Sequence, residues 1–157
     1  MRIQYFRLVA SLIFCQLAGV IGSFFTVPAI PEWYASLEKP SFNPPNWIFS
    51  PVWIFLFVLM GITLYVLWQN LAKKEARVAG ILFMVQLALN ILWSVIFFGL
   101  KSPALAFVEI LLLWIFILLT MIKAFKVSKV AAYLLFPYIL WVSFAAVLNF
   151  FLWRLNF

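Results

Sequence analysis

The chain has 157 residues, of which 68% are hydrophobic, 20% aromatic and 10% charged, with a formal net charge of +7 and a mean hydropathy of +1.17. So few polar residues cannot cover a soluble domain, so the composition excludes that class and predicts an integral membrane protein. The apolar runs are continuous and do not alternate with polar residues, which excludes a transmembrane barrel.

Five apolar intervals are each long enough to cross a bilayer, whose hydrocarbon core needs about 20 helical residues. They predict an all-α bundle of five transmembrane helices in a single domain, residues 1–157. The predicted spans are residues 8–27, 47–71, 78–99, 103–124 and 130–153. The first could also be a signal peptide, but it continues to Pro28 without a small-residue cleavage site and is interpreted as a retained span that ends there.

The basic residues lie in the short connections, so they indicate membrane topology and not nucleic-acid binding. With a cytoplasmic N-terminus, eight of the eleven lie on the cytoplasmic side, namely Arg2, Arg7, Lys73, Lys74, Arg77, Lys123, Lys126 and Lys129. The other side carries Lys39, Lys101 and Arg154. The positive-inside rule therefore predicts that the first connection and the C-terminus face outward.

Small residues form a stripe on the first span, at Ser11, Cys15, Gly19 and Gly22 or Ser23. Such a stripe allows close approach of another helix, either from the same chain or from a second copy. Cys15 is the only cysteine, which excludes an intramolecular disulfide.

The first connection, residues 33–53, reads WYASLEKPSFNPPNWIFSPVW. Its prolines remove backbone donors and exclude a regular helix. We interpret it as a rigid lid over a pocket, from which Trp47, Phe49 and Trp53 lead into the second span; the alternative is an interfacial aromatic belt with a tight turn. The second span begins either near Trp47 or at Ser50, with Pro51 as its first residue.

Two spans place aromatic or amide side chains on one face. On the second span these are Phe49, Trp53, Phe57 and Met60 or Gly61, and this face could meet lipid or a pocket. On the third they are Gln86, Asn90, Trp93 and Phe97. Because unpaired amides are costly in hydrocarbon, this second face is predicted to point at protein or ligand, with bonding between helices as one alternative.

Ser102 and Pro103 predict the start of the fourth span, and Glu109 lies about 9 Å along it. This carboxyl group is the only ionisable group well inside a span. It is protonated, bonded to Asn90 or Gln86, or reached by water, and the sequence leaves these alternatives open.

The fifth span contains Pro137, which predicts a bend. Beyond the bend, one face carries Trp141, Phe144 or Ala145, Leu148 and Leu152, and Asn149 is another amide within the membrane. Spans that carry tryptophan near the lid predict an apolar cavity with aromatic walls.

The chain has no histidine, one cysteine and four acidic residues, and its five glycines are scattered. This composition excludes a Ser-His-Asp triad, zinc and iron–sulfur sites, and a phosphate-binding loop. Indole remains as the group that stacks on flat conjugated ligands.

Three blocks carry a resemblance to a known family. They are WYASLEKPSFNPPNWIFSPVW, the segment from Gln86 to Ser94, and the segment from Pro137 to Asn149. Together they resemble the tryptophan-rich sensory proteins, also called translocator proteins or peripheral-type benzodiazepine receptors (TspO/MBR). The resemblance extends over essentially the whole chain.

The resemblance implies a homodimer in the bacterial inner membrane that acts as a receptor or sensor for porphyrins, such as protoporphyrin IX, and for isoquinoline-type synthetic ligands. It implies no separate cofactor and no metal, the porphyrin being ligand or substrate. The implied alternatives are an enzyme that degrades protoporphyrin with light and oxygen, and a tetrapyrrole or sterol transporter. A family sterol motif is similar to residues 146–154, but Phe150 or Phe151 replaces its tyrosine.

Carried over to this sequence, the ligand-binding residues are Tyr34, Trp53, Asn90, Trp93, Trp141, Phe144 and Ala145. Trp53 and Trp141 are the pair that the resemblance links to photochemistry. We therefore expect a flat, apolar, weakly acidic ligand among the indoles of Trp53, Trp93 and Trp141. In this hypothesis Asn90 orients the ligand, and Tyr34 or Lys39 lies at its polar edge.

Overall fold

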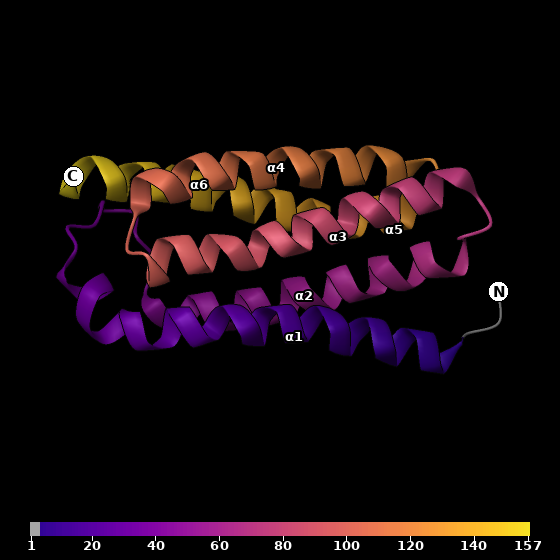
Figure 1. Ribbon diagram of the computed structural model, residues 1–157, viewed down its shortest axis with the longest axis horizontal. Helices are drawn as coiled ribbons and strands as arrows, with labels where there is room; N and C mark the ends of the chain where they lie inside the picture. The colour runs from indigo at the N-terminus through magenta and orange to yellow at the C-terminus, as the bar shows by residue number, and fades with distance from the viewer. Residues whose placement is uncertain (1–3) are drawn as a thin grey trace.

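The computed structural model describes residues 4–157 as a bundle of long helices lying side by side (Figure 1). Helix α1 (Tyr5–Ala29) continues into a π-helical turn, η1 (Ile30–Tyr34), and α3 (Lys74–Ser94) continues into a second, η2 (Val95–Gly99). The others are α2 (Asn46–Gln69), α4 (Pro103–Phe125), α5 (Lys129–Leu134) and α6 (Phe136–Asn156). Over residues 4–157 there is no strand, and the predicted all-α class is confirmed.

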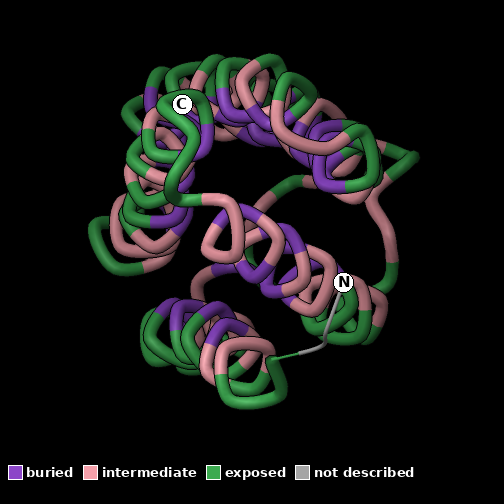
Figure 2. Tube along the Cα trace, turned by 90° about the vertical axis from the view of Figure 1, so that its right-hand side faces the viewer, coloured by how far each residue is buried: buried purple, intermediate pink, exposed green. Residues whose placement is uncertain are grey.

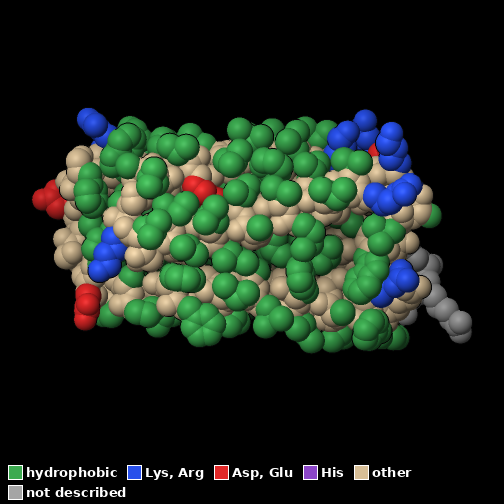
Figure 3. Space-filling view, in the orientation of Figure 1, with side chains coloured by type: hydrophobic (Ala, Val, Ile, Leu, Met, Phe, Trp, Pro, Cys, Tyr) green, Lys and Arg blue, Asp and Glu red, His purple; other side chains and the backbone are tan. Residues whose placement is uncertain are grey.

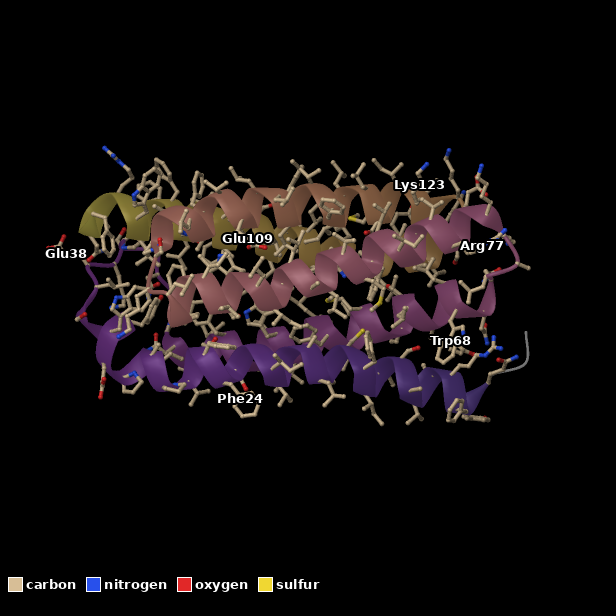
Figure 4. All side chains as sticks on the ribbon, viewed as in Figure 1. Phe24, Glu38, Trp68, Arg77, Glu109 and Lys123 are labelled. Carbon is tan, nitrogen blue, oxygen red and sulfur yellow. The ribbon has the colours of Figure 1, made fainter. Side chains whose placement is uncertain are left out.

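Five helical segments of 23 to 30 residues are long and apolar enough to cross a membrane. Their buried residues face one another, and their exposed residues form the outside of the bundle (Figure 2). Many of these exposed side chains are large and hydrophobic (Figure 3), as at Phe24, which points away from α1 and is 72% exposed (Figure 4). A surface of this kind suits lipid tails and confirms the prediction of an integral membrane protein with five spans.

One of the expected helix ends is wrong. Helix α1 does not end at Pro28 but runs through it to Ala29, and η1 follows without interruption. A proline removes only one backbone donor, and the wider π turn accommodates the residues that follow. Helix α2 begins at Asn46, next to Trp47, so the earlier of the two expected starts is confirmed, and Pro51 lies within the helix. The non-helical part of the predicted lid is therefore confined to residues 37–45, called here the α1–α2 loop.

The other proline signals agree with the structure. Helix α4 starts at Pro103 directly after Ser102, although the Ser102 side chain makes no capping hydrogen bond. The fifth segment is broken at Leu135, between α5 and α6, and Pro137 is the second residue of α6. The bend predicted from Pro137 is therefore confirmed.

Helices α1 and α2 approach closely because small residues lie between them. A Cβ atom added to Gly61 would lie 2.9 Å from the Leu12 Cα atom and 3.2 Å from the Ser11 carbonyl oxygen. Ser11 and Cys15 are buried in this contact region. Of the two interpretations of the small-residue stripe, packing within the chain is confirmed.

Basic side chains gather at the end of the bundle that carries the α2–α3 and α4–α5 connections (Figure 3). Arg77 and Lys123 are both at this end (Figure 4). Arg2, which belongs to the same predicted cytoplasmic group, lies outside the described residues. The direction of the chain through the membrane remains a prediction of the positive-inside rule.

The close contact between α1 and α2 predicts that Gly61→Ala destabilises the fold. The added methyl group meets backbone atoms of α1, which cannot move without shifting the helix, so we expect a loss of about 1–3 kcal/mol. Thermal unfolding in detergent measures it. Gly80→Ala on α3 is the matched control, because nothing lies within 4 Å of the added Cβ and alanine favours a helix. An unchanged melting temperature for Gly61→Ala would contradict the tight contact.

Candidate ligand-binding cavity

A cavity of about 360 Å³ lies among α1, α2, α3 and α6. It is lined by the C-terminal part of α1 with η1, the N-terminal half of α2, the C-terminal part of α3 with η2, and residues 141–152 of α6. It therefore occupies the half of the bundle that carries the α1–α2 loop. Its aromatic lining consists of Tyr34, Phe49, Trp53, Phe57, Trp93, Phe97, Phe98 and Trp141.

Six of the seven expected ligand-binding residues line this cavity: Tyr34, Trp53, Asn90, Trp93, Trp141 and Ala145. Phe144 does not line it. Its ring instead packs 5.5 Å from that of Trp141 and 6.3 Å from that of Phe42. Phe144 therefore supports a wall of the cavity. Trp47, expected to lead from the lid into the second span, is 72% exposed and lies away from the cavity.

A chain of hydrogen bonds leads from the cavity into the core of the bundle. The Asn90 Nδ2 group donates to the Tyr138 hydroxyl at 2.9 Å, and this hydroxyl donates to Gln86 Oε1, also at 2.9 Å. Tyr138 and Gln86 are completely buried. The prediction that the amides of the third span point at protein or ligand is confirmed, since both bond to α6.

A second amide links three helices. Asn149 on α6 accepts a hydrogen bond from the Trp93 indole Nε1 at 3.0 Å and donates to the Pro103 carbonyl at 2.7 Å. The Trp93 ring also stacks on Phe97, with 4.9 Å between ring centroids. These contacts hold the Trp93 indole in one orientation at the cavity wall.

Glu109 is 7% exposed, and both of its carboxyl oxygens are buried without a hydrogen-bond partner among residues 4–157. It lies between α4 and α3 (Figure 4). The expected alternative of a bond to Asn90 or Gln86 is wrong, because neither Glu109 carboxyl oxygen has a hydrogen-bond partner among the described residues. Glu109 does not line the cavity.

The α1–α2 loop is tied to η1 and to the end of α6. The Tyr34 hydroxyl donates to Asn43 Oδ1 at 2.9 Å, and the Lys39 ammonium lies 5.0 Å from the Tyr34 ring centroid. At the end of α6, Asn156 Oδ1 accepts a hydrogen bond from the Glu38 backbone N–H at 2.8 Å, and Asn156 Nδ2 donates to the Glu38 carbonyl at 2.9 Å.

No residue of this loop lines the cavity itself, and neither does Lys39, which was one of two candidates for the polar edge. Tyr34 is the lining residue of that pair. Within the predicted lid, residues 33–53, the cavity is lined by residues of η1 and α2, namely Tyr34, Asn46, Phe49, Ser50 and Trp53. The α1–α2 loop contributes by holding Tyr34.

Comparison with known proteins identifies the family. The TspO/MBR family model matches residues 11–154, almost the entire chain. The chain belongs to the TspO/MBR family. It is 50% identical over 143 residues to the tryptophan-rich protein TspO of Chlorobaculum tepidum, covering 90% of each chain. It is 45% identical over 150 residues to the protein of the same name from Archaeoglobus fulgidus, covering 96% of this chain and 97% of that relative.

The relatives also include the translocator protein of Homo sapiens, which is 40% identical over 143 residues, or 90% of this chain and 85% of that protein. These matches confirm the resemblance drawn from the three sequence blocks. In this TspO/MBR protein, residues 4–157 contain no group of three or more His, Cys, Asp or Glu side chains that could hold a metal ion.

The cavity of this TspO/MBR protein reaches the outer face of the bundle between α1 and α2. Its lining includes Val20 and Val27 on α1, 49% and 64% exposed, and Ile54 on α2, 57% exposed. This face is apolar, so the opening lies where lipid would surround the protein.

Gln16 is a lining residue that our sequence analysis missed. Its side-chain Nε2 donates to the Ile54 carbonyl at 3.0 Å and joins α1 to α2 below this opening. The sequence contained a signal for Gln16, since it is an amide side chain inside an apolar span. The same feature predicted that Gln86 and Asn90 point at protein or ligand.

The paired hydrogen bonds between Glu38 and Asn156 predict that Asn156→Ala loosens the loop. Loss of two hydrogen bonds should make amide exchange in residues 37–45 faster by about tenfold or more. Hydrogen–deuterium exchange by mass spectrometry measures this rate. Asn70→Ala, which removes an amide at the opposite end of the bundle, is the control. Equal exchange in both variants would mean that Asn156 does not anchor the loop.

Proposed function

We propose that this protein is a membrane receptor that binds porphyrins, such as protoporphyrin IX, and other flat apolar ligands in the cavity under the α1–α2 loop. One observation carries the proposal: Trp53, Trp93 and Trp141 come from three different helices and line the same cavity. Indoles provide large flat surfaces that stack on conjugated rings with little loss of conformational entropy. The family membership agrees with this function.

The shape of the cavity supports a ligand taken from the membrane. Its volume, about 360 Å³, is at the lower end for small-molecule sites, and it is open between α1 and α2. A macrocycle can therefore place one edge among the indoles while its remainder extends through the opening. The polar residues Asn90 and Tyr34 then lie within the cavity to orient it.

A second candidate function is the light-driven modification of a bound tetrapyrrole in the presence of oxygen. It is favoured by the placement of Trp53 and Trp141, since both indoles line the cavity next to any bound ring. The Trp141 Nε1 group also has no hydrogen-bond partner among the described residues. Illumination separates this function from binding alone.

The proposed site predicts that protoporphyrin IX quenches the tryptophan fluorescence of the purified protein in the dark. Trp53→Phe and Trp141→Phe should each weaken binding by about two- to tenfold, because a smaller ring stacks less well. Trp68→Phe is the matched control, since Trp68 lies outside the cavity and packs under Arg7 at 5.5 Å.

The same samples are then illuminated in air. A light-driven change in the porphyrin spectrum that both cavity substitutions abolish, while dark binding persists, supports the second function. Dark binding without such a change supports a receptor. Absence of saturable dark binding, or an equal effect of Trp68→Phe, would contradict the proposed site.

A direct test fills the cavity. Ala145 lines it and is half-buried, so Ala145→Phe places a ring where the ligand would lie and should reduce protoporphyrin affinity at least about tenfold. Ala88→Phe adds the same ring to the exposed face of α3 and should leave affinity unchanged. Circular dichroism verifies the helical content of both variants. Unchanged affinity in Ala145→Phe would place the ligand elsewhere.

A further inference from the structure

The hydrogen-bonded chain Asn90–Tyr138–Gln86, called here the amide relay, has a hydroxyl group at its centre. The Tyr138 hydroxyl accepts one hydrogen bond, from Asn90 Nδ2, and donates one, to Gln86 Oε1. A phenol hydroxyl can do both at once, and its hydrogen can rotate to either neighbour. The Tyr138 hydroxyl therefore does not fix the direction in which the hydrogen bonds of the relay are donated.

The two ends of the relay each keep a spare group. Gln86 Nε2 is buried without a partner among residues 4–157. Asn90 lines the cavity, and its Oδ1 atom accepts no hydrogen bond from the described residues. Unlike Gln86 Nε2, this oxygen atom is not completely buried. The inner end therefore has an unused donor, and the cavity end presents an unused acceptor.

The relay can run in the opposite direction without losing a bond. If both amide groups turn over, Gln86 Nε2 donates to Tyr138, and Tyr138 donates to Asn90 Oδ1. Two hydrogen bonds are present in either direction, and the oxygen and nitrogen of an amide occupy similar space. After reversal, Asn90 presents its NH2 group to the cavity in place of its carbonyl oxygen.

Another amide at the cavity, that of Asn149, cannot turn over in this way. Asn149 is held between an indole N–H, which can only donate, and a backbone carbonyl, which can only accept. Turning its amide would oppose donor to donor and acceptor to acceptor. The Asn149 amide therefore has one favourable orientation, whereas the Asn90 amide has two orientations with the same number of hydrogen bonds.

We propose that the amide relay lets this cavity accept a flat ligand whose edge near Asn90 carries either a hydrogen-bond donor or a hydrogen-bond acceptor. Tyr138 and Gln86, which do not line the cavity, are positioning residues that set which group Asn90 presents. The inference rests on the proposed binding of flat ligands and adds the polar chemistry of that ligand class.

Three tricyclic probes of similar shape test the relay. Carbazole carries an edge N–H donor, acridine an edge nitrogen acceptor, and anthracene neither. Dissociation constants are measured by tryptophan quenching in lipid nanodiscs and corrected with empty nanodiscs for partition. In the wild-type protein, carbazole and acridine should each bind about two- to tenfold more tightly than anthracene, as one added hydrogen bond allows.

Gln86→Met should lock the relay in one direction. Without Gln86, the Tyr138 hydroxyl has only Asn90 Oδ1 to accept its hydrogen, and a buried donor without an acceptor is costly. Asn90 then presents only its NH2 group, so acridine should keep its affinity while carbazole falls to the affinity of anthracene. Gln69→Met removes a similar glutamine that donates to Tyr65 outside the cavity and should change none of the three affinities.

A preference of the wild-type protein for only one polar probe would overturn the relay, and this comparison needs no variant. Equal losses of carbazole and acridine in Gln86→Met, or no loss of either, would also overturn it. If protoporphyrin and anthracene bind while the polar probes show no advantage, only the relay fails. If neither protoporphyrin nor anthracene binds, the proposed function fails as well.

Discussion

In a lipid bilayer every polar side chain inside the bundle must find its partner within the protein, because hydrocarbon provides none. This constraint decides how the helices of this protein are connected. Asn149 joins α6 to the indole of Trp93 on α3 and to the first residue of α4, Pro103. Tyr138 joins α6 to both amides of α3. Apolar side chains alone would not select these pairings, since they pack equally well against lipid.

The two halves of the bundle have different side chains between their helices. Toward the basic end, the small residues of α1 and Gly61 of α2 bring the helices into close contact. Toward the α1–α2 loop, aromatic rings on several helices line the cavity. The polar networks then fix the orientation of the rings around it.

The loop contributes to the cavity indirectly. Its own residues lie behind Tyr34, which Asn43 and Lys39 hold in place, and Asn156 fastens it to the end of α6. Phe144 has a similar supporting position between Trp141 and Phe42. Sequence blocks typical of the TspO/MBR family thus include residues that build the walls as well as residues that face the cavity. Only coordinates separate the two groups.

The sequence by itself determined the five spans, the bend at Pro137 and the inward face of the third span. These follow from hydrophobic length, a missing backbone donor and helical spacing, all of which act locally. Only the tertiary structure decided that α1 passes through Pro28, that Lys39 and Phe144 lie outside the cavity, and that Glu109 bonds to neither amide. Those outcomes depend on which helices meet and at what depth, and spacing along one chain does not contain that information.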